Sequence, residues 1–266
     1  MVSKQDIPIL YHSKTSVCSQ KVRLVLAELG VEWQGFFLDL KKGEQFLPDY
    51  LSINPKASVP AYIDGDNCLT ESNDIIMHLV EEKFKSSHLS IQPNQFVDVK
   101  SWLDESIRFH TAVHVLTTLS LNREKLLSFS PEELAEKLNR IPDKSRAQRL
   151  YDVVQNGLEG IAASTSIIYL KNIFQKLETQ LQRGEFLCGD KVTVADLAIL
   201  PFVMRIDFLQ LKPDWSGAKF EAVDVWIAKL KQRPSFETAI MDFHSPEALE
   251  KYKTHGAPVR EELLKL

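Results

Sequence analysis

Residues 9–33 read ILYHSKTSVCSQKVRLVLAELGVEW, and this stretch decides the fold. The short apolar run at 8–12 is typical of a buried strand. A helix is expected over 17–29, because apolar residues recur there on one helical face, and Gly30 suits the position after its last turn. The apolar residues at 33–40 predict a second strand. The chain therefore begins with a strand, a helix and a strand.

The next segment adds two strands and a helix. A short helical turn is expected at 49–53, and strands at 59–63 and 68–70 flank an Asp-Gly turn, which is a strong hairpin signal. The apolar periodicity at 71–84 predicts a helix. A βαβ unit followed by a ββα unit predicts an α/β domain with a mixed sheet.

The remainder of the chain is expected to be all helical. Residues 86–95 are polar and predict a linker, and no strand pattern follows them. Helices are expected at 102–119, from the capping box at Ser130, at 167–181, from Thr193 and at 220–231. In the sequence TVADL, which begins at Thr193, the side chains of Thr193 and Asp196 can each accept a hydrogen bond from the other residue's backbone N–H. We interpret Asp196 as a folding residue rather than a catalytic one.

The composition argues against several classes of protein. The 266 residues include 32 Lys and Arg against 36 Asp and Glu, a balance that disfavours sequence-independent binding to nucleic acid. Cys18, Cys68 and Cys188 are too few and too scattered for a disulfide framework, and they fit a reducing compartment. No apolar stretch reaches the roughly 18 residues of a membrane span, and the first residues lack the apolar core of a signal peptide. We therefore expect a cytoplasmic protein that binds neither nucleic acid nor membrane.

The turn from the first strand into the first helix is the segment best suited to chemistry. Thr15, Ser16 and Cys18 lie where free backbone N–H groups and the helix dipole favour negative charge. Such a turn can stabilise a thiolate, either of Cys18 or of a bound ligand. An ordinary N-cap also requires a residue such as Ser16, and a free cysteine is often a small buried hydrophobe. The residues alone leave both interpretations open.

Three segments in this order resemble the glutathione transferase superfamily: residues 9–33, NPKASVPAYIDGDNCLTES at 54–72, and FLCGDKVTVADLAILP at 186–201. The resemblance implies a thioredoxin-like N-terminal domain at 5–86. It also implies an all-helical domain at 96–266 that forms the electrophile site, with an insert at about 116–160. Glutathione is then the co-substrate, a small hydrophobic electrophile the substrate, and a homodimer the expected assembly.

Two groups within the superfamily are similar to this chain. The pattern Ser16-x-Cys18-Ser19 resembles both the zeta class, which includes maleylacetoacetate isomerase, and the bacterial tetrachlorohydroquinone dehalogenases. The sequence GEQF at 43–46 resembles the zeta class. The sequences RID at 205–207 and RPSFE at 233–237 resemble the dehalogenase group, which also has an extended middle of its helical domain.

The resemblance assigns roles at the thiol and at the glycyl end of glutathione. Ser16 aligns with the serine that hydrogen-bonds the glutathione sulfur in the zeta pattern. Cys18 aligns with the cysteine that resolves a glutathione conjugate through a mixed disulfide in the dehalogenases. Gln45 aligns with a residue that holds the glycyl end.

The resemblance also assigns the rest of the peptide site. Val59 aligns with the residue before a cis-proline, here Pro60, and its backbone pairs with the cysteinyl part of glutathione. Glu71 and Ser72 align with the pair that binds the γ-glutamyl amine and carboxylate, and Ser72 can also cap the helix that begins there. Ser58 stands where a longer glutamine often lies, which puts that contact in doubt.

Three functions remain open. The first is a transferase that activates glutathione for attack on an electrophile, with reductive dehalogenation or ether cleavage through a Cys18 mixed disulfide. The second is a maleyl-type isomerase, which needs no resolving cysteine and uses basic side chains such as Arg108 and Arg205. The third is a non-catalytic binding or regulatory protein with this fold.

His110 and His114 have a spacing that suits a metal, but no third ligand accompanies them. We therefore expect no metal, and we place both histidines beside the substrate.

Overall fold

The computed structural model describes residues 7–265, and the chain divides into two compact units. The first unit contains the chain up to Leu103 together with residues 186–201 and 229–244. The second contains residues 104–185, 202–228 and the chain from Ser245 on. The sequence-based bounds of 5–86 and 96–266 stay a prediction, and residues 5, 6 and 266 lie outside the described part of the chain.

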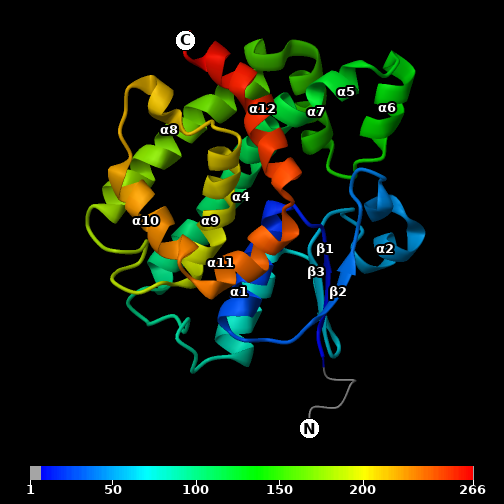
Figure 1. The fold of residues 1–266 in the computed structure, drawn as a ribbon. Coiled ribbons are helices and arrows are strands. Elements are labelled where there is room, and N and C mark those ends of the chain that lie inside the picture. The colour runs from blue at the N-terminus through cyan, green and yellow to red at the C-terminus, as the bar shows by residue number, and fades with distance from the viewer. Residues whose placement is uncertain (1–6, 266) are drawn as a thin grey trace. The chain divides into compact units, whose positions relative to one another are not determined.

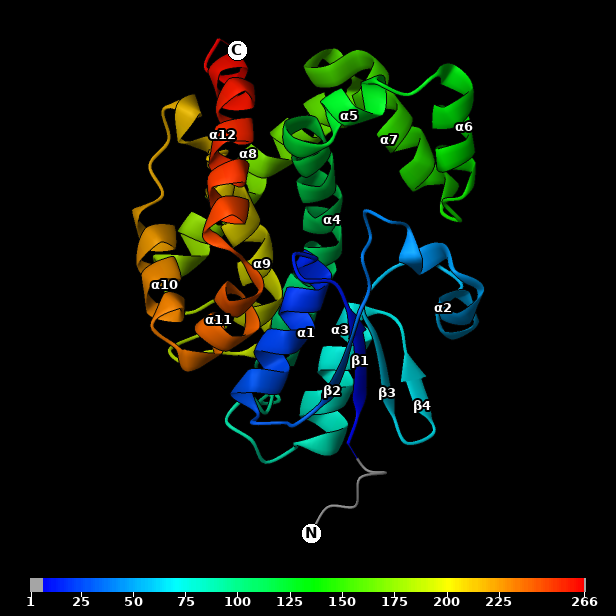
Figure 2. The same ribbon diagram turned by 45° about the vertical axis from the view of Figure 1, so that its right-hand side comes forward.

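The first unit is built on a four-stranded mixed sheet (Figure 2). Its strands are β1 (Ile9–His12), β2 (Gln34–Phe37), β3 (Ala61–Asp64) and β4 (Asn67–Leu69). They lie in the order β2-β1-β3-β4, with β1 parallel to β2 and the other neighbours antiparallel. The α/β fold class and the mixed sheet that the sequence predicts are therefore confirmed.

Helices cover both faces of this sheet because side chains alternate along each strand. On one side, Tyr11 and Ala61 pack with Tyr50 of α2 (Pro48–Ile53), which follows the short 3-10 helix η1 (Glu44–Phe46). On the other side lie α1 (Val17–Glu28) and α3 (Ser72–Met77), as Figure 2 shows. Gly30 follows α1 with a φ of 64°, which suits the C-terminal stop expected there.

The helix expected at 71–84 is in fact two elements. Six residues of α-helix, α3, continue into a π-helical segment, η2 (His78–Lys83). The polar segment that follows contains turns and bends but no helix or strand until Phe96, as the linker prediction requires.

Two short elements from late in the sequence complete the first unit. They are α11 (Pro234–Ala239) and the 3-10 helix η5 (Met241–Phe243). Figures 1 and 2 show α11 beside α1, and a hydrogen bond of 2.8 Å from Arg23 Nε to the carbonyl oxygen of Ala239 joins the two helices.

The second unit is helical, as expected. The helices that lie in it wholly or partly are α4 (Phe96–Leu121), α5 (Arg123–Leu127), α6 (Pro131–Asn139), α7 (Lys144–Asn156), α8 (Ile161–Leu181), α9 (Val194–Phe208), α10 (Glu221–Lys231) and α12 (Pro246–Leu263), with short 3-10 turns η3 (Gly157–Glu159) and η4 (Pro213–Ser216). The capping box at Ser130 forms in full, with Glu133. The apolar series of α8 is buried, which confirms the expected amphipathic helix. None of the helices within residues 7–265 is long and apolar enough to span a bilayer.

Candidate functional site

The turn between β1 and α1 positions Ser16 and Cys18 on the first turn of a helix. Ser16 is the N-cap, and its Oγ accepts a hydrogen bond of 3.3 Å from the backbone N–H of Ser19. Cys18 is the second residue of α1 and is half-buried. Because a serine hydroxyl can accept and donate at the same time, the capping role of Ser16 leaves its proton available to a ligand. The structure thus confirms Ser16 as the N-cap, and its role toward a ligand stays a prediction.

The side chain of Arg23 forms hydrogen bonds with the backbone of this turn. Its side chain is 1% exposed, and its guanidinium donates to the carbonyl oxygens of Ser13 (3.2 Å) and Lys14 (2.9 Å). The same group lies 3.2 Å from Nδ1 of His12 and donates to the Ala239 carbonyl. One buried side chain therefore ties the loop before Ser16 to the sheet and to α11.

The electrostatics of this cluster are set by burial. Burial lowers the pKa of Arg23 to about 9, and burial together with the positive charge of Arg23 lowers the pKa of His12 to about 4. His12 is therefore neutral at physiological pH and can accept a hydrogen bond from the guanidinium. The guanidinium also lies 3.8 Å from the centroid of the Phe243 ring, a cation–π contact.

The connection from α2 to β3 presents the backbone of Val59. The Val59–Pro60 peptide bond is cis, as the resemblance implies. The Tyr50 hydroxyl and Asn54 Nδ2 both donate to the Ser58 carbonyl, at 2.5 and 2.7 Å, and Asn54 Nδ2 also lies 3.3 Å from Ser58 Oγ. No described residue forms a hydrogen bond with the backbone N–H or carbonyl of Val59. Hydrogen bonds within the loop thus stabilise its conformation, and the peptide groups of Val59 are available to a ligand.

The start of α3 corrects one expectation. Glu71, not Ser72, is the N-cap, with extended backbone angles, and Ser72 is the first helical residue. The expected capping role of Ser72 is therefore wrong, because the helix begins at Ser72 itself, one residue earlier than a Ser72 cap requires. The exposed carboxylate of Glu71 binds the ammonium group of Lys56 at 2.5 Å, which raises the pKa of Lys56.

Gln45 lies in η1, on the connection between β2 and α2. Its Oε1 is buried and has no hydrogen-bond partner among the described residues. Buried polar atoms are nearly always paired, so an orphaned acceptor suggests that a donor from outside the chain completes it. This observation fits the expected contact with the peptide end of a ligand.

The four residues expected to bind the electrophile lie in the second unit and do not share one environment. His110 and His114 face the same side of α4, with ring centroids 6.4 Å apart. Arg108 is highly exposed and lies 3.9 Å from Glu105. Its position two residues before His110 places it on a different side of the helix. Arg205 is buried and lies over the ring of Tyr252.

His114 has an unusual charge environment. Burial first, and then the positive charges of Arg146, His110 and Arg149, hold its pKa well below the ordinary value. His114 is therefore neutral at physiological pH. Within residues 7–265, no group of three or more His, Cys, Asp or Glu side chains is arranged to hold a metal ion.

Arg23 and Lys21 were not among the predicted site residues, although their positions in the first helix could have indicated buried charges. Both lie in the first helix among apolar residues that the periodicity assigns to the core, and both are buried. Charged residues are almost never fully buried unless they are paired, so long cations within an apolar face indicate fixed partners.

Comparison with known protein families identifies two domains in this chain. The glutathione S-transferase N-terminal domain matches residues 8–81, and the glutathione S-transferase C-terminal domain matches residues 169–234. Together they cover just over half of the chain. The chain belongs to the glutathione transferase superfamily.

Individual relatives in this superfamily differ in the functions that their names describe. The chain is 26% identical over 237 residues to the tetrachloro-p-hydroquinone reductive dehalogenase of Sphingobium chlorophenolicum, which covers 86% of this chain and 94% of that protein. It is 28% identical over 244 residues to the transcriptional regulator URE2 of Saccharomyces cerevisiae, which covers 87% of this chain and 67% of that protein. The crystal structure of the β-etherase LigF from Sphingobium sp. strain SYK-6 has a TM-score of 0.75 at 21% identity, covers 87% and 98% of the two chains, and shows the shared fold.

The N-terminal family match, at residues 8–81, includes every residue expected to bind the peptide part of glutathione, from Ser16 to Ser72. The two matches leave residues 82–168 outside both family models. This unmatched stretch contains the insert expected at about 116–160, which the structure fills with the end of α4 and with α5, α6 and α7.

Proposed function

We propose that this superfamily member is a glutathione-dependent transferase that acts on a hydrophobic electrophile by way of Ser16 and Cys18. The observation that carries the proposal is the first turn of α1, where a capping serine with a free hydroxyl proton and a half-buried cysteine thiol lie two residues apart. Both side chains lie at a helix start, where backbone N–H groups favour a thiolate.

The remaining loops of the first unit fit the peptide portion of glutathione. The unpaired peptide groups of Val59 suit the cysteinyl backbone, and the orphaned Oε1 of Gln45 suits an N–H donor near the glycyl end. Glu71 already holds an ammonium group, that of Lys56, and the γ-glutamyl amine has the same chemistry. Ser58, which replaces a longer residue, contributes its carbonyl to the loop rather than an added contact.

Bound glutathione supplies the nucleophilic thiolate and, in a reductive reaction, supplies two electrons together with a second glutathione. In the transfer step, the Ser16 hydroxyl donates a hydrogen bond to the thiolate and keeps its proton, while the sulfur attacks carbon, the carbon–sulfur bond forms and the leaving group departs with the electron pair of its bond to carbon. Each pKa unit by which the site lowers the thiol pKa corresponds to about 1.4 kcal/mol.

Cys18 adds a reductive branch, supported by the similarity to a reductive dehalogenase. The Cys18 thiolate attacks the sulfur of the conjugate, forms a mixed disulfide with glutathione, and releases the carbon–sulfur electron pair to carbon, which takes up a proton. A second glutathione then attacks the mixed disulfide and regenerates Cys18. The net change replaces carbon–halogen by carbon–hydrogen, consumes two thiols, and yields oxidised glutathione and hydrogen halide.

Replacing Cys18 with serine is expected to separate the two branches. The variant should form the glutathione conjugate of a halogenated hydroquinone but release the reduced product at least about 100-fold more slowly, because the resolving thiolate is absent. Mass spectrometry of products over time measures both. The matched variant Cys68→Ser, at an exposed cysteine outside the site, should behave as wild type. Reductive turnover that survives the Cys18 change would remove the resolving role.

Replacing Glu71 with glutamine is expected to raise the KM for glutathione about tenfold with little change in kcat, because a charged contact to the amine is lost in ground and transition states alike. Replacing Lys56 with alanine removes the resident ammonium group and should lower KM instead. Steady-state kinetics of conjugation, with glutathione varied, measures both. A KM for glutathione that neither change alters would contradict the assignment of Glu71.

A regulatory protein without turnover is the second candidate, because the chain is 28% identical to a transcriptional regulator. Retention on immobilised glutathione together with no activity on halogenated, ether or maleyl substrates would favour it. Maleyl isomerisation is less well supported, because Arg108 is exposed beside Glu105 and Arg205 is buried against Tyr252.

We also propose a homodimer in the cytoplasm, on the superfamily resemblance, and sedimentation velocity tests the assembly.

A further inference from the structure

Lys21 is a buried cation in the part of α1 that follows Cys18. Its side chain is 2% exposed, and its Nζ donates a hydrogen bond of 2.6 Å to Oδ1 of Asn73. Asn73 is the second residue of α3, and its Nδ2 donates to the carbonyl oxygen of Leu103 at 2.9 Å. The second bond orients the amide, so that its oxygen faces Lys21. The contact joins the helix that carries Cys18 to the helix that begins at Ser72.

Two groups that can carry a negative charge act on this ammonium. Cys18 lies three residues before Lys21, which places the two side chains on neighbouring positions of one helical face. Burial lowers the pKa of Lys21 to about 8, while the charges of Cys18 and Glu71 raise it. Cys18 comes from α1 and Glu71 immediately precedes α3, so both helix starts contribute one group.

Burying an ammonium group is costly, because its charge is removed from water. A negative charge on Cys18 reduces that cost. Because such interactions are reciprocal, the cation that is stabilised by the thiolate also stabilises the thiolate.

We propose that Lys21 is a positioning residue that keeps Cys18 in its thiolate form and, through Asn73, fixes the Cys18 turn relative to the Glu71–Ser72 helix start. Lys21 acts through Cys18 and needs no contact with the electrophile. The role rests on the proposed function for its place in turnover, but its effect on Cys18 is a property of the free protein.

The test measures the rate at which iodoacetamide alkylates Cys18 as a function of pH in the full chain without glutathione, read by mass spectrometry of the Cys18 peptide. The variants are Lys21→Met and Lys21→Gln, and exposed Cys68 is the reference in every sample. Both variants should move the midpoint of the Cys18 profile upward by about one pH unit or more, because a cation close to the sulfur is lost. The Cys68 profile should stay in place.

Lys21→Gln separates charge from hydrogen bonding, because glutamine can still donate to Asn73 but carries no charge. A midpoint that moves in Lys21→Met and stays at the wild-type value in Lys21→Gln would mean that only the hydrogen bond matters, and would overturn the proposal. Lys14→Met, which removes an exposed cation of the same loop, should shift the midpoint by no more than a few tenths, because solvent screens that charge.

A third variant covers the case in which both Lys21 changes unfold the protein, detected by alkylation of buried Cys188. Asn73→Asp places a carboxylate beside Lys21 and partly neutralises it, so the Cys18 midpoint should rise. An unchanged midpoint in folded Asn73→Asp overturns the proposal.

Steady-state kinetics of turnover provide an independent test of the role of Lys21. Lys21→Gln should lower kcat of the reductive step severalfold near pH 7, leave KM for glutathione unchanged, and recover as pH rises above the new midpoint. If no glutathione-dependent turnover exists but the midpoints move, the role of Lys21 stands and the proposed function falls. If turnover exists and the midpoints stay, only the role of Lys21 falls.

Discussion

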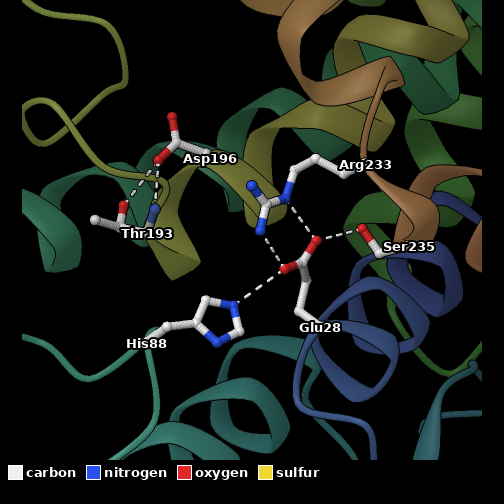
Figure 3. Close-up of polar contacts among 6 residues, drawn as sticks. All are labelled: Glu28, His88, Thr193, Asp196, Arg233 and Ser235. Atoms are coloured by element: carbon white, nitrogen blue, oxygen red, sulfur yellow. Dashed lines mark hydrogen bonds and ion pairs between the residues drawn. The ribbon is translucent and has the colours of Figure 1, made fainter.

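Replacing Glu28 with alanine is expected to lower the free energy of unfolding by about 2–3 kcal/mol, because half-buried Arg233 and buried Ser235 lose the acceptor of their hydrogen bonds. The Glu28 side chain is 6% exposed and receives two hydrogen bonds from Arg233, at 2.7 and 2.6 Å. Ser235 donates to the same carboxylate, and His88 Nε2 lies 3.1 Å from it, as Figure 3 shows. The cluster joins the end of α1 to the start of α11.

Urea denaturation at pH 7 measures the effect, and Glu32→Ala, at an exposed glutamate four residues further on, is the matched control. The control should change the free energy of unfolding by less than about 0.5 kcal/mol. A Glu28 variant as stable as this control would contradict the assigned role.

The same cluster predicts a pH dependence. Burial alone raises the pKa of Glu28, but the hydrogen bonds from Arg233 and Ser235, the charge of Arg233 and the bond to His88 lower it overall. A lowered native pKa means that the stabilisation is complete above the unfolded value of about 4.3 and is lost as pH falls through the native value. The stability difference between wild type and Glu28→Gln should therefore shrink below about pH 4.

Replacing Asp196 with alanine is expected to lower the free energy of unfolding by about 3 kcal/mol, because two buried backbone N–H groups lose their acceptor. Asp196 is fully buried. It accepts hydrogen bonds from the N–H of Thr193 (2.8 Å) and of Leu187 (2.9 Å), and from the Thr193 hydroxyl (2.9 Å; Figure 3). It thus fixes both the helix start and the loop before it.

Thermal and urea unfolding of Asp196→Ala measure this loss, with exposed Asp190→Ala in the same segment as the control. Asp196→Asn should lose less, because its amide oxygen can still accept one of the N–H bonds. If Asp196→Ala keeps its stability but loses activity, the interpretation of Asp196 as a folding residue is wrong.

Local patterns predicted the elements whose determinants lie close together in sequence. The apolar run at 8–12 and the periodicity of 17–29 predicted β1 and α1, and the hydrogen bond between Asp196 and Thr193, three residues apart, was predicted from the capping motif. The superfamily resemblance correctly implied the cis bond before Pro60, and it proposed the roles of Ser16 and Cys18. These features were predictable because each depends on a few neighbouring residues.

Other elements were missed because their stability comes from distant contacts. The sequence did not predict α12, which contains Gly256 and Pro258, residues that disfavour helices. The structure explains the glycine, because a Cβ there would lie 1.8 Å from the carbonyl oxygen of Leu209. The division of the expected 71–84 helix into α3 and η2 likewise has no local sequence signal.

The sequence by itself determined the strand and helix order of the N-terminal α/β region, the caps at Ser16 and Ser130, and which residues are candidates for the thiol site. Only the tertiary structure decided which distant groups the buried charges of α1 contact. Glu28 and Arg233 are separated by 205 residues, Arg23 and Ala239 by 216, and Lys21 and Asn73 by 52. Periodicity records which face of a helix is buried, but it does not record which distant group meets a buried charge. That pairing is set by packing of the whole chain, since a buried charge is tolerated only where the fold brings it a partner.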